Sequence, residues 1–110
     1  MKTKEMKNIE LKIEKIKTKL FKLEIFRPGS ITQQYKKPKE KIGSFYQLNY
    51  MYKMKSRSEY VRPELLKKIK KQNSDYKIFK KLIEQWIDLG IQHSKIEIAE
   101  LIQQKNLKVK

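Results

Sequence analysis

The stretch from Arg27 to Pro63 most constrains the fold of this chain. It reads RPGSITQQYKKPKEKIGSFYQLNYMYKMKSRSEYVRP, and it holds all three prolines, all three arginines and five of the six tyrosines. Proline interrupts helices, while aromatic and β-branched residues favour strands. The stretch therefore predicts a non-helical segment between two helical ones.

Residues 43–52 alternate in a way that indicates a β-strand. One predicted face carries Tyr46, Leu48, Tyr50 and Tyr52, and the other carries Phe45, Gln47, Asn49 and Met51. A second strand is predicted from Lys55 to Arg62, which makes a hairpin. The connection lacks the Asn-Gly pair of tight hairpins, so the turn type stays open. A lone hairpin is marginal in water, so we expect one face to lie on a helix.

The residues between the first helix and the hairpin are the most basic part of the stretch. The Arg27-Pro28-Gly29-Ser30 sequence ends the preceding helix, because the residue before a proline is pushed out of the α region. Residues 30–35 are expected to form a short helical turn capped by Ser30. Residues 36–41 read KKPKEK and predict a basic loop that buries nothing, which suits either phosphate contact or a flexible linker.

Residues 1–26 are predicted to form an amphipathic helical arm. Its apolar residues recur at steps of three and four, which is an a/d heptad seam: Met6, Ile9, Ile13, Ile16, Leu20 and Leu23. This seam can form a homodimer or lie against the C-terminal helix of the same chain, and the sequence leaves both open. Beside it runs a row made of Lys12, Lys15, Lys19 and Lys22, which suits a solvated face or phosphate contact.

Residues 63–104 are predicted to form a long helical segment, followed by a frayed tail at 105–110. Pro63 suits the first turn of a helix. Residues 72–75 could cap a new helix or be crossed without a break. Gly90 costs a helix about 1 kcal/mol relative to alanine, and a close helix crossing would explain it. The fold class expected for this single domain is α+β, with an N-terminal helix, a central β-hairpin and a long C-terminal helical segment.

The formal net charge of +16 calls for an anionic partner. Residues 27–62 carry nine of the basic residues against only Glu40 and Glu59, and they are also the most aromatic part of the chain. Basic side chains can follow a phosphate backbone, and aromatic rings can stack on unpaired bases. The candidate nucleic-acid-binding residues are Arg27, Lys36, Lys37, Lys39, Lys41, Tyr46, Tyr50, Lys53, Lys55 and Arg57. Lysine-rich codon usage would account for part of the charge, and the tyrosines also suit a hydrophobic face.

The sequence contains few residues that are suited to catalysis. The chain has one histidine, His93, and no cysteine, and its carboxylates are scattered. We therefore expect no enzyme activity, no metal site and no cofactor. No apolar run reaches the roughly 20 residues of a membrane span, and the N-terminus alternates in charge where a signal peptide is apolar. The expectation is a soluble cytoplasmic protein that does not engage a membrane.

Several motifs in the central stretch follow one another in a recognisable order. These are Arg27-Pro28-Gly29-Ser30-Ile31 with Tyr35, Gly43-Ser44-Phe45-Tyr46-Gln47-Leu48, and Lys55 to Glu64 ending in Val61-Arg62-Pro63-Glu64. The order resembles a small prokaryotic family of unknown function that is often encoded near transposases and other mobile-element genes. Its cysteine-rich knuckle is missing here, where residues 36–41 stand instead. The resemblance implies a link to DNA transactions, and it brings no settled activity.

These observations predict a non-catalytic nucleic-acid-binding accessory protein, directed to the backbone through the basic loop and hairpin. A larger nucleic-acid enzyme, such as one of a mobile element, would be its protein partner. Two alternatives are a protein-interaction adaptor that uses the heptad helix, and an inhibitor that occupies the substrate groove of a nucleic-acid enzyme.

Overall fold

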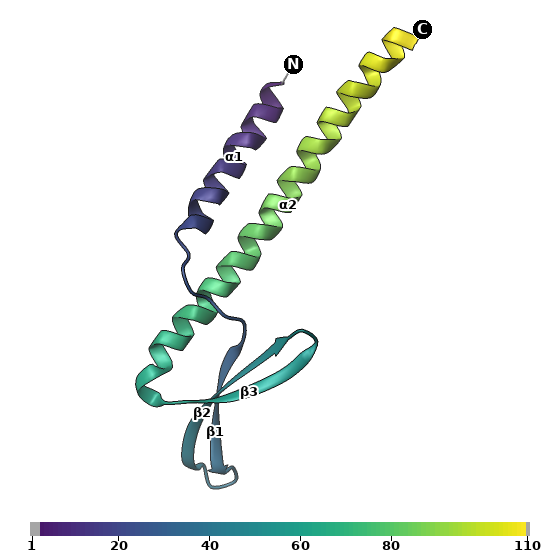
Figure 1. Cartoon of the computed structure of the whole chain (residues 1–110). Coiled ribbons are helices and arrows are strands. Elements are labelled where there is room, and N and C mark those ends of the chain that lie inside the picture. The colour runs from purple at the N-terminus through teal and green to yellow at the C-terminus, as the bar shows by residue number, and fades with distance from the viewer. Residues whose placement is uncertain (1–2, 110) are drawn as a thin grey trace. The chain divides into compact units, whose positions relative to one another are not determined.

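The computed structural model describes residues 3–109, with side chains described for residues 3–105. The elements follow the order α1 (Lys4–Phe21), β1 (Ser30–Lys37), β2 (Ile42–Tyr52), β3 (Lys55–Val61), a 3-10 turn (Pro63–Leu65) and α2 (Leu66–Val109), as Figure 1 shows. This arrangement confirms the α+β fold class. The chain forms two compact units: unit 1 comprises Met1–Lys22 and Lys80–Lys110, and unit 2 comprises Leu23–Phe79. Within residues 3–109, no helix has the length and apolar character needed to cross a bilayer.

The sheet of unit 2 is an antiparallel meander in the order β1-β2-β3. The prediction of a helical turn at residues 30–35 was wrong, because these residues form most of β1. Ile31 pairs with Leu48 and Gln33 pairs with Tyr46, so the β-branched and aromatic residues of this segment find partners across a strand. The predicted basic loop at residues 36–41 was wrong in part: its first two residues end β1, and only residues 38–41 form a turn.

The predicted hairpin of β2 and β3 is confirmed, and its turn type is now defined. Lys53 and Met54 connect the strands, and both have positive φ angles, of 50° and 66°. Positive φ at both central residues is the mark of a type I′ turn, whose twist matches that of the strands. The chain forms this turn without the asparagine and glycine that usually occupy it.

Unit 2 is held together around the sheet and the first part of α2. Leu48 at the middle of β2 is fully buried, and Val61 at the end of β3 is 5% exposed. The ring of Phe26 stacks on that of Phe79, with centroids 4.7 Å apart. The Nδ2 of Asn73, a buried residue of α2, donates a hydrogen bond of 3.1 Å to the Arg27 carbonyl.

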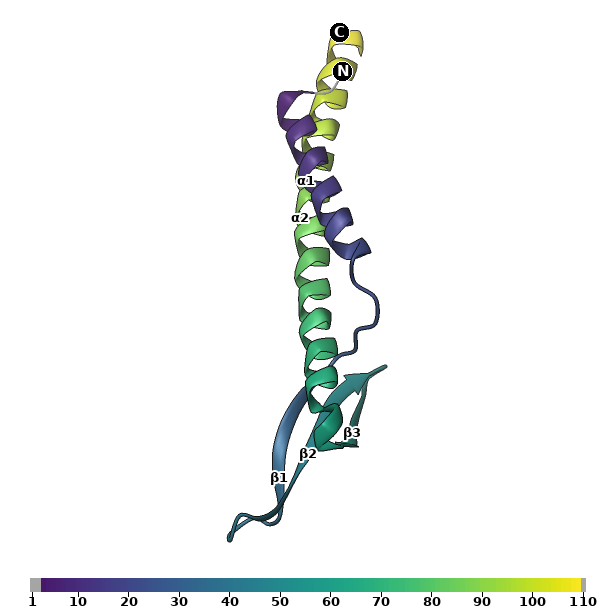
Figure 2. The same ribbon diagram turned by 90° about the vertical axis from the view of Figure 1, so that its left-hand side faces the viewer.

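In unit 1, α1 packs along the C-terminal part of α2, as both views show (Figures 1 and 2). Met6, Ile9 and Ile16 of the predicted seam are buried in the single chain. The seam thus lies against the C-terminal helix, which was one of its two expected positions. A homodimer through the same residues would need α1 to leave α2.

The predicted extent of the first helix was wrong, because α1 ends at Phe21 and not at residue 26. The residues from Leu23 onwards belong to unit 2, where Phe26 packs on an aromatic ring of α2 and the Arg27 N–H donates to the Gln72 carbonyl at 3.3 Å. These contacts hold the segment in an irregular conformation outside the helix. Leu23, the last predicted seam position, therefore lies outside the helix.

The long C-terminal helix is continuous where the sequence left a choice. Residues 72–75 are crossed without a break, and α2 extends to Val109. The predicted end near Gln104 was therefore wrong, while residue 110 of the predicted tail lies outside the described residues. A Cβ at Gly90 would meet nothing within 4 Å. A close helix crossing, which was one explanation for this glycine, is therefore not supported.

Candidate nucleic-acid interface

The two faces of the sheet differ in which residues they bury. Residues paired across antiparallel strands share a face, so the register assigns every strand residue to one side. The Leu48 face carries Ile31, Tyr46, Leu48, Tyr50, Tyr52, Arg57, Glu59 and Val61. The Asn49 face carries Thr32, Phe45, Gln47, Asn49, Met51, Ser58 and Tyr60. The Leu48 face includes both buried residues of the sheet, Leu48 and Val61, whereas every residue of the Asn49 face is half-buried or exposed.

On the Leu48 face, Arg27 is held by two neighbours. Its Nη2 lies 3.2 Å from Oε2 of Glu59, and its guanidinium lies 4.9 Å from the ring centre of Tyr50. The Tyr50 hydroxyl donates a 2.9 Å hydrogen bond to Oε1 of the same carboxylate. The hydrogen bonds from Arg27 and then from Tyr50 lower the pKa of Glu59. Two predicted contact residues, Arg27 and Tyr50, are thus engaged in contacts within unit 2.

The Asn49 face presents a ladder of polar side chains and one exposed ring. Asn49 donates from Nδ2 to the Thr32 hydroxyl at 3.0 Å and accepts at Oδ1 from the Ser58 hydroxyl at 2.9 Å. Tyr60 beside this ladder is 65% exposed and Met51 is 64% exposed. Tyr60 was missed from the sequence because the second strand had no assigned faces. Val61 is an apolar residue at the end of this strand, so it would be expected to face the core. Because neighbouring strand residues point to opposite faces, this would have placed Tyr60 on the other face.

The predicted lysines lie at the two ends of β2. Lys36, Lys37, Lys39 and Lys41 surround the β1–β2 turn, whereas Lys53 and Lys55 lie at the β2–β3 turn, and all six are exposed. Figure 1 shows these turns at opposite ends of the sheet. Because β2 has 11 residues, its ends are about 35 Å apart. The structure therefore separates these lysines into two clusters, which we call the β1–β2 tip and the β2–β3 tip.

Little within unit 2 neutralises these two tips. Among residues 3–105, no carboxylate forms an ion pair with any of the six lysines, and Lys53 lies 5.3 Å above the ring of Tyr52. Arg57, another predicted contact residue, is exposed and pairs with Tyr50 in the strand register. Tyr46 is half-buried and pairs with Val61. Six of the predicted basic residues therefore lie at the tips, and the tyrosines of β2 lie on the Leu48 face, where Tyr52 is 54% exposed.

A basic hollow of about 270 Å³ lies between the start of β1 and the first part of α2. Its lining combines two ammonium groups and two hydroxyls with backbone and an amide, and it contains no carboxylate: Gly29, Ser30, Ile31, Lys70, Asn73, Ser74 and Lys77. Ammonium and hydroxyl donors are the groups that bind phosphate oxygens. This hollow could not be predicted from the sequence, because the fold brings together segments about 40 residues apart.

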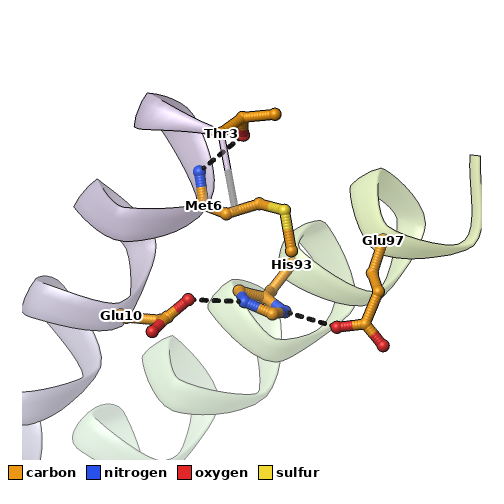
Figure 3. Close-up of polar contacts among 5 residues, drawn as sticks. All are labelled: Thr3, Met6, Glu10, His93 and Glu97. Atoms are coloured by element: carbon orange, nitrogen blue, oxygen red, sulfur yellow. Dashed lines mark hydrogen bonds and ion pairs between the residues drawn. The ribbon is translucent and has the colours of Figure 1, made fainter. Parts of the chain in front are cut away.

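Unit 1 has a separate groove of about 590 Å³ between α1 and α2. Figure 3 shows the His93 imidazole between two carboxylates: Nε2 is 3.0 Å from Oε2 of Glu10 on α1, and Nδ1 is 3.9 Å from Oε2 of Glu97. Lys17 lies 5.5 Å above the Trp86 ring in the same groove. Within residues 3–105, no three ligating side chains are grouped to hold a metal ion. His93 thus links the two helices of unit 1.

Comparison of the chain with protein families, curated proteins and solved structures finds no match. The resemblance to the mobile-element family therefore remains an expectation from the motifs. The functional argument rests on the geometry of unit 2.

Proposed function

We propose that this protein binds nucleic acid through the sugar-phosphate backbone and catalyses no reaction. The observation that carries the proposal is the placement of six exposed lysines, without ion pairs among the described residues, at the two ends of β2. Uncompensated charge of this kind costs free energy through self-repulsion unless an anion neutralises it. A phosphate backbone supplies anions at a regular spacing.

The two tips suit a polymer better than a small anion. Their separation of about 35 Å corresponds to about ten phosphates along one strand of a duplex, at 3.4 Å each. Lysine makes phosphate contacts that carry no sequence information. The proposed binding is accordingly directed to the backbone and reads little sequence.

Two further features of unit 2 support the proposal. The exposed ring of Tyr60 on the Asn49 face is a stacking partner for an unpaired base. The basic hollow offers Lys70, Lys77 and two serine hydroxyls to a phosphate group. Arg27 and Tyr50 act indirectly in this proposal, by fixing the start of β1 against the sheet.

The protein works in the cytoplasm as an accessory to a larger enzyme of DNA or RNA, such as one of a mobile element. The adaptor alternative has less support, because the heptad seam that would engage a partner is buried against α2 at Met6, Ile9 and Ile16. An inhibitor of a nucleic-acid enzyme would use the same basic surface, and competition between the protein and nucleic acid for that enzyme would reveal it.

The test is fluorescence anisotropy with labelled duplex DNA, single-stranded DNA and RNA over a range of salt. If six lysines contact phosphates, affinity should fall about a thousandfold between 50 and 200 mM salt. Changing Lys36, Lys37, Lys39 and Lys41 to glutamine should reduce the slope of log K against log salt by about four.

The matched control changes Lys12, Lys15, Lys19 and Lys22 of α1 and its C-cap to glutamine. Both variants lose the same formal charge, so a general electrostatic effect would weaken binding equally in both. Equal losses would contradict the assignment to the β1–β2 tip. An absence of binding to all three nucleic acids at 50 mM salt would overturn the proposed function itself.

A further inference from the structure

The part of α2 in unit 1 carries two apolar stripes. The first faces α1 and consists of residues that are buried or half-buried: Leu82, Trp86, Leu89, His93 and Ile96. The second, which we call the outer stripe, consists of Ile87, Ile91, Ser94, Ile98 and Leu101, of which Ser94 also lines the edge of the groove between α1 and α2. Its steps of four, three, four and three residues make it an a/d seam. Its apolar members are uncovered, with exposures of 55% for Ile87, 49% for Ile91, 51% for Ile98 and 51% for Leu101.

We propose that the outer stripe is the surface through which two copies of this chain form an antiparallel dimer. A helix with an a/d seam on its open side is suited to pack against another helix. An uncovered row of isoleucine and leucine favours association, because burying it removes apolar surface from water. This dimer differs from the one considered for the N-terminal seam, and it does not depend on the proposed function.

The charges beside the outer stripe indicate that the occupant is a second copy. Asp88 and Lys95 are seven residues apart, so they flank the stripe on the same side one heptad apart. Both are exposed, and neither has an ion pair among residues 3–105. When two α2 helices run antiparallel, with Ile91 of one copy facing Ser94 of the other, Asp88 faces Lys95 across the interface. Two-fold symmetry repeats this pair, so each dimer gains two ion pairs.

The alternative pairings lack this complementarity. Sliding one helix by a heptad in one direction sets Lys95 against Lys95, and sliding it in the other direction sets Asp88 against Asp88. In a parallel, in-register dimer, the flanking positions opposite Asp88 and Lys95 are Ile83 and Gly90, so no charge pair forms. Flanking charges set the orientation and register of paired helices. The stripe is therefore self-complementary in one antiparallel register.

The first test is sedimentation equilibrium on the full chain, which should behave as a dimer. The variant with Ile91→Gln and Ile98→Gln should be monomeric at the same concentration and keep its helical circular dichroism, because both side chains are about half exposed in the single chain. Ile78→Gln is the control, since Ile78 is 45% exposed on the same helix but lies off the stripe. A monomeric parent chain, or a doubly substituted variant that still dimerises, overturns the proposal.

The second test addresses register through charge. Asp88→Lys and Lys95→Asp should each weaken self-association about tenfold, because each replaces two attractive pairs by two repulsive ones. Mixing the two variants restores both attractive pairs, so native mass spectrometry should find mainly the mixed dimer. A statistical mixture of the three dimers overturns the antiparallel register.

The third test uses disulfide formation, which the absence of native cysteine makes clean. Chains carrying Ile91→Cys should cross-link with chains carrying Ser94→Cys under mild oxidation. Chains carrying Ile91→Cys alone should stay largely uncross-linked. Efficient cross-linking of Ile91→Cys with itself would indicate parallel pairing and overturn the proposed arrangement.

Discussion

The Arg27 guanidinium lies 4.9 Å from the ring centre of Tyr50, on the face of the sheet that also carries Glu59. The Glu59 carboxylate then bonds both partners, at 3.2 Å from the Arg27 Nη2 and 2.9 Å from the Tyr50 hydroxyl. One carboxylate thereby joins the segment before β1 to the two neighbouring strands β2 and β3. The contacts among Arg27, Tyr50 and Glu59 should therefore contribute to the stability of unit 2.

The stability of unit 2 should depend on pH through Glu59. Its bonds to Arg27 and Tyr50 hold its pKa below the ordinary value of 4.5. The stabilisation is therefore fully present above pH 4.5 and is lost as the pH falls through the lowered pKa. Glu59→Gln should cost about 0.5 kcal/mol at pH 7, since the carboxylate is about half exposed. Urea unfolding of parent and variant should show this difference shrinking towards pH 3, whereas an equal difference at both pH values would contradict the prediction.

Asn73→Ala should destabilise the protein by about 1–3 kcal/mol. The Asn73 side chain is buried and donates to the Arg27 carbonyl, so alanine leaves that carbonyl without its donor. Ser74→Ala, at the exposed neighbouring position of the same helix, is the control and should change stability little. Thermal unfolding of both variants checks the prediction, and equal melting temperatures would contradict it.

Substituting alanine for glycine should have opposite effects at two positions. Gly90→Ala should stabilise by about 1 kcal/mol, because the site is helical and a Cβ there meets nothing within 4 Å. Gly29→Ala should destabilise, because Gly29 has a φ of 129° and a Cβ would lie 2.8 Å from Cδ1 of Leu48. Chemical denaturation measures both free energies of unfolding. Loss of stability at Gly90 would show that this part of α2 is more crowded than described.

Replacing Lys53-Met54 by Asn-Gly should stabilise the β2–β3 hairpin by about 1 kcal/mol. Both residues have positive φ, which asparagine and glycine adopt at lower cost than lysine and methionine. Hydrogen exchange of the β2 and β3 amides should slow accordingly. The same replacement at the exposed Lys67-Lys68 pair of α2 should destabilise instead, because glycine weakens a helix. Faster exchange in the hairpin variant would argue against a type I′ turn.

The helices and the hairpin could be predicted from local patterns, and the third strand could not. Alternation in residues 43–52 and the heptad spacing from Met6 to Leu20 are properties of single segments, so they can be read from the sequence. Residues 30–35 become a strand because they pair with β2, and a strand partner is a tertiary property. The same reason explains why α1 ends at Phe21: contacts of Phe26 and Arg27 with α2 hold the next segment outside the helix.

The candidate site was predictable in its residue types and not in its geometry. The lysines of residues 36–41 and the pair Lys53 and Lys55 are exposed as expected for charged turns. From the sequence, these six lysines were predicted to form one basic region. In the structure, β2 separates the two groups of lysines by about 35 Å. Arg27 and Tyr50 were predicted to contact nucleic acid, whereas in the structure both bind Glu59. No sequence pattern shows that Glu59 lies beside them.

The hydrogen bond between Glu10 and His93 joins residues 83 positions apart, and this separation bears on how the protein is made. During translation, α1 leaves the ribosome before α2, so its apolar seam gains its partner only after the distant part of α2 has emerged. The strands of unit 2 are close neighbours in sequence and can assemble on the nascent chain well before then. The helix made before the sheet is thus buried after it, and during that interval Met6, Ile9 and Ile16 are open to chaperones.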